Sequence, residues 1–157
     1  MEIKEKEKYM KLAIKEAQKA KDKEEVPIGC VIVKAGKIIA KGHNLRESKQ
    51  NSLLHAEIIA INKACNKLNN FRLEDCELFV TVEPCIMCAG AIIQSRIKKV
   101  YYGANDTKYG AVQSVAKIFE IPSNHKVEFE CGILQQECSE IVKEFFKKLR
   151  ENKSKNK

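Results

Sequence analysis

Two short stretches of the sequence carry side chains that could bind one metal ion and move a proton. These are His-Ala-Glu at 55–57 and Pro-Cys-Ile-Met-Cys at 84–88. Cys85 and Cys88 would lie on one side of the first turn of a helix, close enough to hold the same ion. With His55 as a third ligand, a tetrahedral Zn2+ keeps one position open for water, as catalytic zinc sites do.

Glu57 is the predicted proton carrier of this site. Zinc lowers the pKa of bound water from about 16 to about 7, and a nearby carboxylate can take that proton and deliver it to a leaving group. On a regular helix, however, side chains two residues apart point about 200° away from each other around the axis. We therefore expect His55 to lie at the boundary of its helix if it shares a site with Glu57.

The two stretches together are more specific than either alone. A single Cys-x-x-Cys could be a redox pair or half of a structural zinc site. A structural site would need a further paired ligand, and the sequence has no second Cys-x-x-Cys and no His-x-x-x-His. The combination of His-x-Glu with Pro-Cys-x-x-Cys is typical of zinc-dependent deaminases that act on nucleobases.

The surrounding pattern predicts alternating helices and strands that position these residues. Apolar periodicity predicts helices over 3–21, 53–68 and 85–94, and a long final helix. The apolar stripe of that final helix consists of Leu134, Cys138, Ile141, Val142, Phe145 and Leu149. Apolar and β-branched runs predict strands over 28–33, 37–40, 77–82, 99–102 and 126–131, the first two joined as a hairpin at Ala35-Gly36. We therefore expect one α/β domain over residues 1–150, with a five-stranded sheet flanked by helices, and a Lys-rich tail over 151–157.

Composition narrows the class of protein. The 157 residues are 44% hydrophobic and carry a net charge of +8, which fits one globular domain and not a disordered chain. No apolar run approaches the roughly 20 residues of a membrane span, and the N-terminus has no apolar segment behind its charges. Seven scattered cysteines, an odd number, argue against a disulfide framework. The expected location is the reducing cytoplasm.

Positive charge is concentrated at the C-terminus. Residues 143–157 hold seven basic and two acidic side chains, a net charge of +5, with Phe145 and Phe146 among them. Such a segment could be a solvated helix end or the binding surface for an anionic partner, of which nucleic acid is the first candidate. Charge alone does not separate these two interpretations.

The chain resembles bacterial tRNA-specific adenosine deaminases, a family of the zinc-dependent cytidine and deoxycytidylate deaminase superfamily. The resemblance covers roughly residues 7–150 and includes HAEIIAI at 55–61, RLEDCELFVTVEPCIMCAGAI at 72–92 and the final GILQQECSEIVKEFFKKLR at 132–150. Residues 79–92 and the Glu-Cys…Phe-Phe ending are its discriminating parts within the wider superfamily. It implies a three-layer α/β/α, cytidine-deaminase-like fold with a five-stranded mixed sheet. It also implies hydrolytic deamination of adenosine to inosine at the wobble position of a tRNA anticodon.

The resemblance assigns roles to individual positions. One Zn2+ per subunit would be held by His55, Cys85 and Cys88, with Glu57 as the catalytic proton carrier. Three further residues would contact the base, namely Asn44, Ala56 and Ile28. Four would touch the anticodon loop, namely Asp106, Lys108, Phe146 and Lys147. The resemblance also implies a homodimer with tRNA as its partner and no membrane association.

The sequence departs from the family at two places and leaves alternatives open. Gln113 stands where relatives usually have Gly, and the segment 50–54 lacks their common Pro-Thr. Neither departure touches the catalytic set. One alternative is a deaminase of a free base or nucleotide of the guanine or cytosine type, which shares the four catalytic residues. Another is a zinc-stabilised nucleic-acid-binding module without catalysis.

Overall fold

Ten elements of secondary structure follow one another in residues 1–155, the part of the chain that this computed structural model describes. In chain order they are α1 (Ile3–Asp22), β1 (Gly29–Lys34), β2 (Lys37–His43), α2 (Ala56–Leu68), β3 (Cys76–Val82), α3 (Ile86–Gln94), β4 (Lys99–Ala104), the 3-10 turn η1 (Ile118–Glu120), β5 (Glu128–Glu130) and α4 (Gln135–Lys155).

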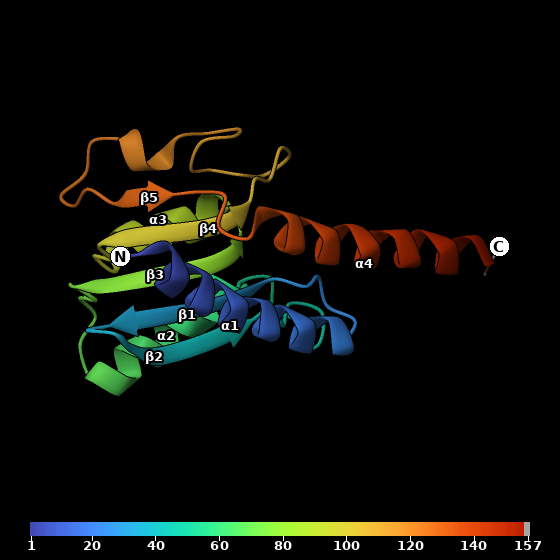
Figure 1. Ribbon diagram of the computed structural model, residues 1–157, viewed down its shortest axis with the longest axis horizontal. Coiled ribbons are helices and arrows are strands. Elements are labelled where there is room, and N and C mark those ends of the chain that lie inside the picture. The colour runs from blue at the N-terminus through green and yellow to red at the C-terminus, as the bar shows by residue number, and fades with distance from the viewer. Residues whose placement is uncertain (156–157) are drawn as a thin grey trace.

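The five strands form one mixed sheet in the order β2-β1-β3-β4-β5 (Figure 1). β1 pairs antiparallel with both β2 and β3, whereas β3–β4 and β4–β5 are parallel pairs. The parallel connection from β3 to β4 passes through α3, as a crossover between parallel strands requires. This architecture confirms the predicted five-stranded mixed sheet.

Alternating side chains of the central strands bury the two faces of the sheet under different helices. In β3, Leu78 and Val80 belong to the core cluster that contains α2 and α3 residues, whereas Phe79 belongs to the cluster that contains α1 residues and Cys138 of α4. Neighbouring strand residues point to opposite faces, so a strand that is apolar throughout is covered on both sides. The result is the predicted three-layer α/β/α fold, with α1 and α4 on one face and α2 and α3 on the other.

Most predicted elements lie within a few residues of the observed ones. The hairpin turn is at Ala35-Gly36, where both residues have the positive φ angles of a tight hairpin turn (50° and 75°). The second helix begins at Ala56, three residues later than predicted, because His55 is its N-cap. The last strand is shorter than predicted, and η1 was not predicted at all.

The final helix differs from its prediction in length and burial. α4 continues to Lys155, so the predicted boundary at residue 150 falls inside a helix; residues 156–157 of the predicted tail lie outside the described residues. Of the predicted apolar stripe, only Cys138 is fully buried, and Leu149 is 39% exposed. The reason is geometric, since α4 packs on β3 and β4 only near its start and then projects past the sheet (Figure 1). No helix within residues 1–155 is both long enough and apolar enough to cross a membrane.

Candidate active site

The directions of the strands bring the predicted site residues together at one end of the strands. Because β1 is antiparallel to its neighbours, its first residues lie beside the last residues of β2 and β3. Asn44 follows β2, Ile28 precedes β1, and Cys85 follows β3 by three residues. The backbone N–H of Asn44 donates to the carbonyl of Ile28 at 3.2 Å, which joins two predicted substrate-binding residues.

The three predicted metal ligands converge on one point. The Nδ1 atom of His55 lies 3.6 Å from the Sγ atoms of both Cys85 and Cys88, and all three ligand atoms lie within 4.8 Å of one another. A tetrahedral zinc with bonds of about 2.3 Å to sulfur and about 2.0 Å to nitrogen needs S–N separations of roughly 3.5 Å. The donor set and the two N–S separations therefore fit Zn2+.

Both metal-binding stretches begin helices with an extended residue. His55 (φ −77°, ψ 156°) is the N-cap of α2, and Cys85 (φ −77°, ψ 178°) is the N-cap of α3. A helical wheel does not apply to an extended N-cap, so His55 and Glu57 can face the same space, as the sequence argument required. Each helix N-terminus also carries the positive end of the helix dipole, which favours a thiolate at Cys85.

Hydrogen bonds within the cluster favour one thiolate. The hydrogen bond from the Cys88 thiol, helped by His55, lowers the pKa of Cys85 to about 4. The same contacts raise the pKa of Cys88 and that of His55 above their ordinary values, since the Cys85 thiolate stabilises a proton on each neighbour. The charge of Arg46, which lines the same cleft as His55, opposes the rise in the pKa of His55. A bound divalent cation would replace these protons as the partner of the thiolates.

Glu57 is almost completely buried beside the cluster, with 4% of its surface exposed. Burial raises the pKa of its carboxyl to about 7, and the charge of Cys85 adds to this rise. A carboxyl with this pKa can both accept and release a proton near neutral pH, as a general acid–base catalyst must.

One cleft of about 970 Å³ contains nearly all the predicted site residues. Its lining includes His55, Glu57 and Cys85. The predicted substrate and RNA contacts that also line it are Asn44, Ala56, Ile28, Asp106, Lys108 and Phe146. Lys147, the remaining predicted RNA contact, is exposed and is not among the described residues that line the cleft. Cys88 lies beneath the cleft and is fully buried.

Asn44 brings an unsatisfied polar atom to this cleft. Its side chain is 93% buried, with a relative exposure of 7%, and its Oδ1 has no hydrogen-bond donor among the described residues. An unpaired buried acceptor costs about 1–3 kcal/mol. A ligand that brought an N–H or O–H group to this atom would recover that energy.

Glu83 was not among the predicted site residues, yet it organises one side of the cleft. It is 3% exposed, and its carboxylate accepts hydrogen bonds from the backbone N–H groups of Asp106, Val112, Gln113 and Ser114 at 2.9–3.1 Å and from the Ser114 hydroxyl. Burial alone would raise the pKa of Glu83, but these hydrogen bonds outweigh it and lower the pKa. The acidic residue immediately before Pro84 was the only sequence signal.

The loop that Glu83 holds includes two residues singled out in the sequence. The Asp106 carboxylate accepts from the backbone N–H groups of Lys108 and Tyr109, both at 3.0 Å, so it shapes its own loop. Gln113 adopts no positive φ angle, and its Oε1 accepts a hydrogen bond from the hydroxyl of Tyr102, a buried residue of β4. The departure from the family glycine therefore adds a contact between loop and sheet.

Glu25 plays the matching role on the other side of the cleft. It is 1% exposed and accepts hydrogen bonds from the backbone N–H groups of Glu47 and Ser48 and from the Ser48 hydroxyl. These bonds outweigh burial and lower the pKa of Glu25. The loop after β2, which contains Arg46, is thus fixed by a carboxylate that lies 22 residues earlier in the chain. Nothing in the local sequence pattern indicated this contact.

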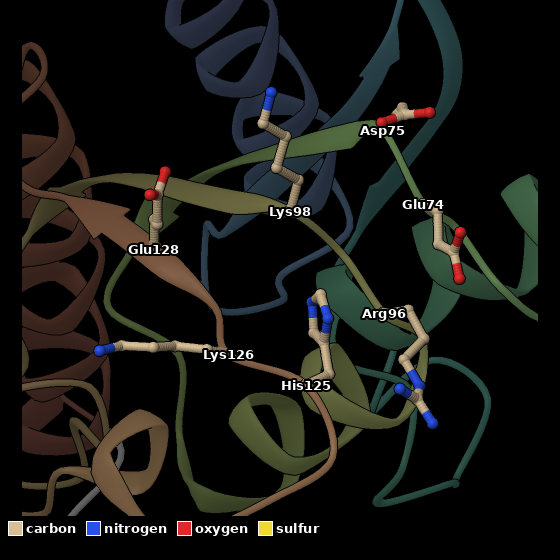
Figure 2. A pocket seen from close by; sticks show the side chains of 7 residues that line it. All are labelled: Glu74, Asp75, Arg96, Lys98, His125, Lys126 and Glu128. Carbon is tan, nitrogen blue, oxygen red and sulfur yellow. The ribbon is translucent and has the colours of Figure 1, made fainter.

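A second cavity, of about 550 Å³, lies near the opposite ends of the strands and shows no comparable convergence. Figure 2 shows its charged side chains pointing in different directions, with Lys98 and Lys126 directed away from His125. His125 donates from Nε2 to the carbonyl of Ile97 at 2.7 Å, and Arg96 donates to the carbonyl of Asn124 at 3.3 Å. These bonds tie the chain before β5 to the sheet, which is a structural role.

The fold and the site together define the class of the protein as a deaminase. The family model of MafB19-like deaminases matches residues 4–150, almost the whole chain. A solved structure of a guanine deaminase from Bacillus subtilis is also similar, with 36% identity, a TM-score of 0.62, and coverage of 76% of this chain and 80% of that one.

Two further comparisons narrow the family. A tRNA-specific adenosine deaminase of Aquifex aeolicus (strain VF5) is 51% identical over 148 residues, which is 94% of this chain and 97% of that protein. A solved structure from studies of A-to-I editing by tRNA:A34 deaminases at the wobble position of transfer RNA has 42% identity and a TM-score of 0.83, and the match covers 85% of this chain and 97% of that one. The chain therefore belongs to the family of tRNA-specific adenosine deaminases.

Proposed function

We propose that this protein hydrolyses adenosine to inosine at the wobble position of a tRNA anticodon, with one Zn2+ per subunit. One observation carries the proposal: a single cleft brings together the His55, Cys85 and Cys88 cluster, a buried Glu57 and the unsatisfied Oδ1 of Asn44. Similarity to tRNA-specific adenosine deaminases supports the choice of substrate.

The reaction consumes water and releases ammonia. A C–O bond forms at C6 of the purine, and the bond from C6 to its amino nitrogen breaks. His55, Cys85 and Cys88 would hold the zinc, which when bound makes water more acidic and more available for attack near neutral pH. Glu57 takes a proton from the attacking water and gives it to the departing amino group, which its raised pKa permits.

The remaining cleft residues position the nucleoside. The Oδ1 of Asn44 accepts a hydrogen bond from the bound nucleoside, while its amide N–H groups can donate to a ring nitrogen. Ile28 and the fully buried Ala56 supply apolar surface beside the base. Burying Asn44 and Glu57 away from bulk water strengthens both polar interactions.

The outer residues of the cleft and residues of α4 contact the rest of the RNA. Phe146 is 39% exposed at the cleft and lies edge-on to Phe145, with 5.3 Å between ring centroids. An exposed aromatic ring offers a stacking surface for an unpaired loop base. Lys108 and Lys147 are exposed cations on the adjoining loop and helix, suited to phosphate groups. Asp106 contributes by shaping the loop of Lys108.

We also propose a homodimer that works in the cytoplasm, where a tRNA substrate is found. Large apolar side chains are exposed next to the site: Ile86, beside Cys85, is 67% exposed, and Val115, beside the Glu83-bound loop, is 61% exposed. A second copy of the chain would cover such surface. Light scattering of the purified protein should give twice the chain mass, and the mass of a single chain would contradict the dimer.

The test of the proposed activity is mass spectrometry of an anticodon stem-loop with adenosine at position 34, alongside free adenosine, guanine and cytosine. Conversion of the target base to hypoxanthine adds about one mass unit and should occur in the stem-loop. Glu57→Gln should lower turnover by at least about 10²-fold while the bound zinc, measured by elemental analysis, is unchanged. Glu47→Gln, at an exposed carboxylate of the same cleft, is the matched control and should stay active.

The outcomes separate the alternatives. Conversion of a free base but not the stem-loop would favour the guanine- or cytosine-type deaminase. Zinc binding without conversion of any substrate would favour a nucleic-acid-binding module. Near-normal turnover by Glu57→Gln would refute the role of Glu57, whichever substrate is used.

A further inference from the structure

The cleft has cations on its outer edge that no carboxylate neutralises. Arg46, Lys108 and Lys143 all line it, and none of the ion pairs found in residues 1–155 includes any of them. They come from three separate segments, namely the loop after β2, the loop after β4 and helix α4. Cations left without partners around a binding cleft favour an anionic substrate.

Three of the acidic groups that line the cleft, those of Glu25, Glu83 and Asp106, are already bound by backbone N–H groups, whereas the exposed Glu47 carboxylate forms no ion pair with Arg46. The carboxylate of Glu25 is held by backbone N–H groups of the Arg46 loop, and those of Glu83 and Asp106 by N–H groups of the Lys108 loop. The carboxylates therefore shape the loops and leave the side-chain cations available for a ligand.

The backbone around Arg46 is held in place by hydrogen bonds. The two residues after it, Glu47 and Ser48, donate their backbone N–H groups to the buried Glu25, and its own carbonyl accepts from Asn51 at 3.0 Å. A side chain on a fixed backbone loses less entropy when it binds than one on a mobile loop. Its guanidinium group can donate two parallel hydrogen bonds to one phosphate, which a Lys ammonium cannot do.

Arg46 lies where the backbone of a nucleic-acid strand would pass if one of its nucleotides entered the cleft. It follows Asn44 by two residues, and Arg46, Asn44 and His55 all line the same cleft. Lys108 lies beyond β4, on the other side of β1 and β3 in the sheet. A nucleotide whose base enters between these two loops therefore places its backbone beside cations from both edges of the cleft.

We propose that Arg46 binds a phosphodiester that flanks the reacting nucleotide, and that this contact selects a nucleotide within a strand over a free base. The proposal rests on the proposed function and goes beyond it, because it names the chemical group of the substrate that one further residue recognises. Arg46 acts as a specificity-determining residue at the edge of the cleft.

Binding is measured by fluorescence anisotropy with a labelled anticodon stem-loop, so that the result does not depend on turnover. Arg46→Gln should raise Kd about tenfold, because a charge-assisted bidentate contact is lost. It should also reduce the slope of log Kd against log salt by about 0.7, the value for one phosphate contact on a single strand. Arg46→Lys should recover most of the salt slope but only part of the affinity.

Arg72→Gln is the matched control. Arg72 is exposed, lies 5.0 Å from the ring centroid of Phe71 and does not line the cleft among the described residues. Its replacement should leave Kd and the salt slope unchanged. Equal melting temperatures for wild type and Arg46→Gln would exclude loss of folding as the cause of weaker binding.

A chemical cycle then identifies the contact itself. Stem-loops with one neutral methylphosphonate linkage, placed in turn on each side of position 34, are bound to wild type and to Arg46→Gln. At one linkage, neutralisation should weaken wild type about tenfold and leave Arg46→Gln nearly unaffected. Additive effects at every linkage, or normal binding by Arg46→Gln, would overturn the proposal. Absence of deamination in wild type would instead refute the proposed function, while the binding cycle would still decide the role of Arg46.

Discussion

The buried carboxylate of Glu83 should add several kcal/mol to the free energy of unfolding, because it holds the following loop in place. Its two oxygens accept five hydrogen bonds, four of them from backbone N–H groups of residues 106–114. In Glu83→Gln the amide oxygen can replace one carboxylate oxygen. The NH2 group then replaces the other oxygen and faces the backbone N–H of Asp106, so that two hydrogen-bond donors oppose each other. Charged acceptors are worth about 1 kcal/mol more per bond than neutral ones. Because the remaining amide oxygen keeps part of the network, we expect a loss of about 2–4 kcal/mol.

The pH dependence of this effect has a definite sign. The pKa of Glu83 is lower in the folded protein than its ordinary value of 4.5. A group with a depressed pKa stabilises the fold fully above its unfolded-state pKa, and that stability is lost as pH falls through the folded-state pKa. The difference in unfolding free energy between wild type and Glu83→Gln should therefore be constant from about pH 5.5 to pH 8 and shrink below about pH 4.5.

Urea unfolding of both proteins at a series of pH values, with chelator present so that metal release does not contribute, measures this difference. Hydrogen exchange read by mass spectrometry should show faster exchange in Glu83→Gln mainly over residues 105–116, because the lost bonds lie there. Glu74→Gln, at an exposed carboxylate with no hydrogen bond or ion pair to another described residue, is the control. Stability within about 0.5 kcal/mol of wild type at pH 7, or a difference that does not vary with pH, would refute the reasoning.

Two further predictions concern the same loop. Gly110→Ala should destabilise the protein by about 2 kcal/mol in thermal or urea unfolding, because the added Cβ would collide with carboxyl atoms of Glu83. The control is Gly90→Ala, in a helix where no atom lies within 4 Å of the added Cβ, and it should be neutral or slightly stabilising. Equal effects of the two substitutions would contradict the steric argument. Gln113→Ala should cost about 1 kcal/mol by removing the acceptor of the Tyr102 hydroxyl, and adding Tyr102→Phe should cost little more; fully additive losses would show that the two side chains are not coupled.

Local sequence features were sufficient to predict the cluster of His55, Cys85 and Cys88 and most of the secondary structure. Cys85 and Cys88 are one helical turn apart, so their spacing brings two ligands together whatever the rest of the chain does. The hairpin at Ala35-Gly36 and the apolar strand β3 are equally local, since turn preference and side-chain alternation act over a few residues. The resemblance to a known family added the three-layer arrangement of the fold and the predicted roles of Asn44 and the outer residues.

Tertiary structure alone decided how the site is assembled and held. That His55 is an extended N-cap, and so can face the same cleft as Glu57, depends on where α2 begins against β2. The contacts of Glu25 and Glu83 span 22 to 31 residues, and a periodic pattern carries no information about a hydrogen bond over such a distance. A buried acidic residue resembles a surface one in sequence, because only the N–H groups that the fold brings to it make its burial favourable.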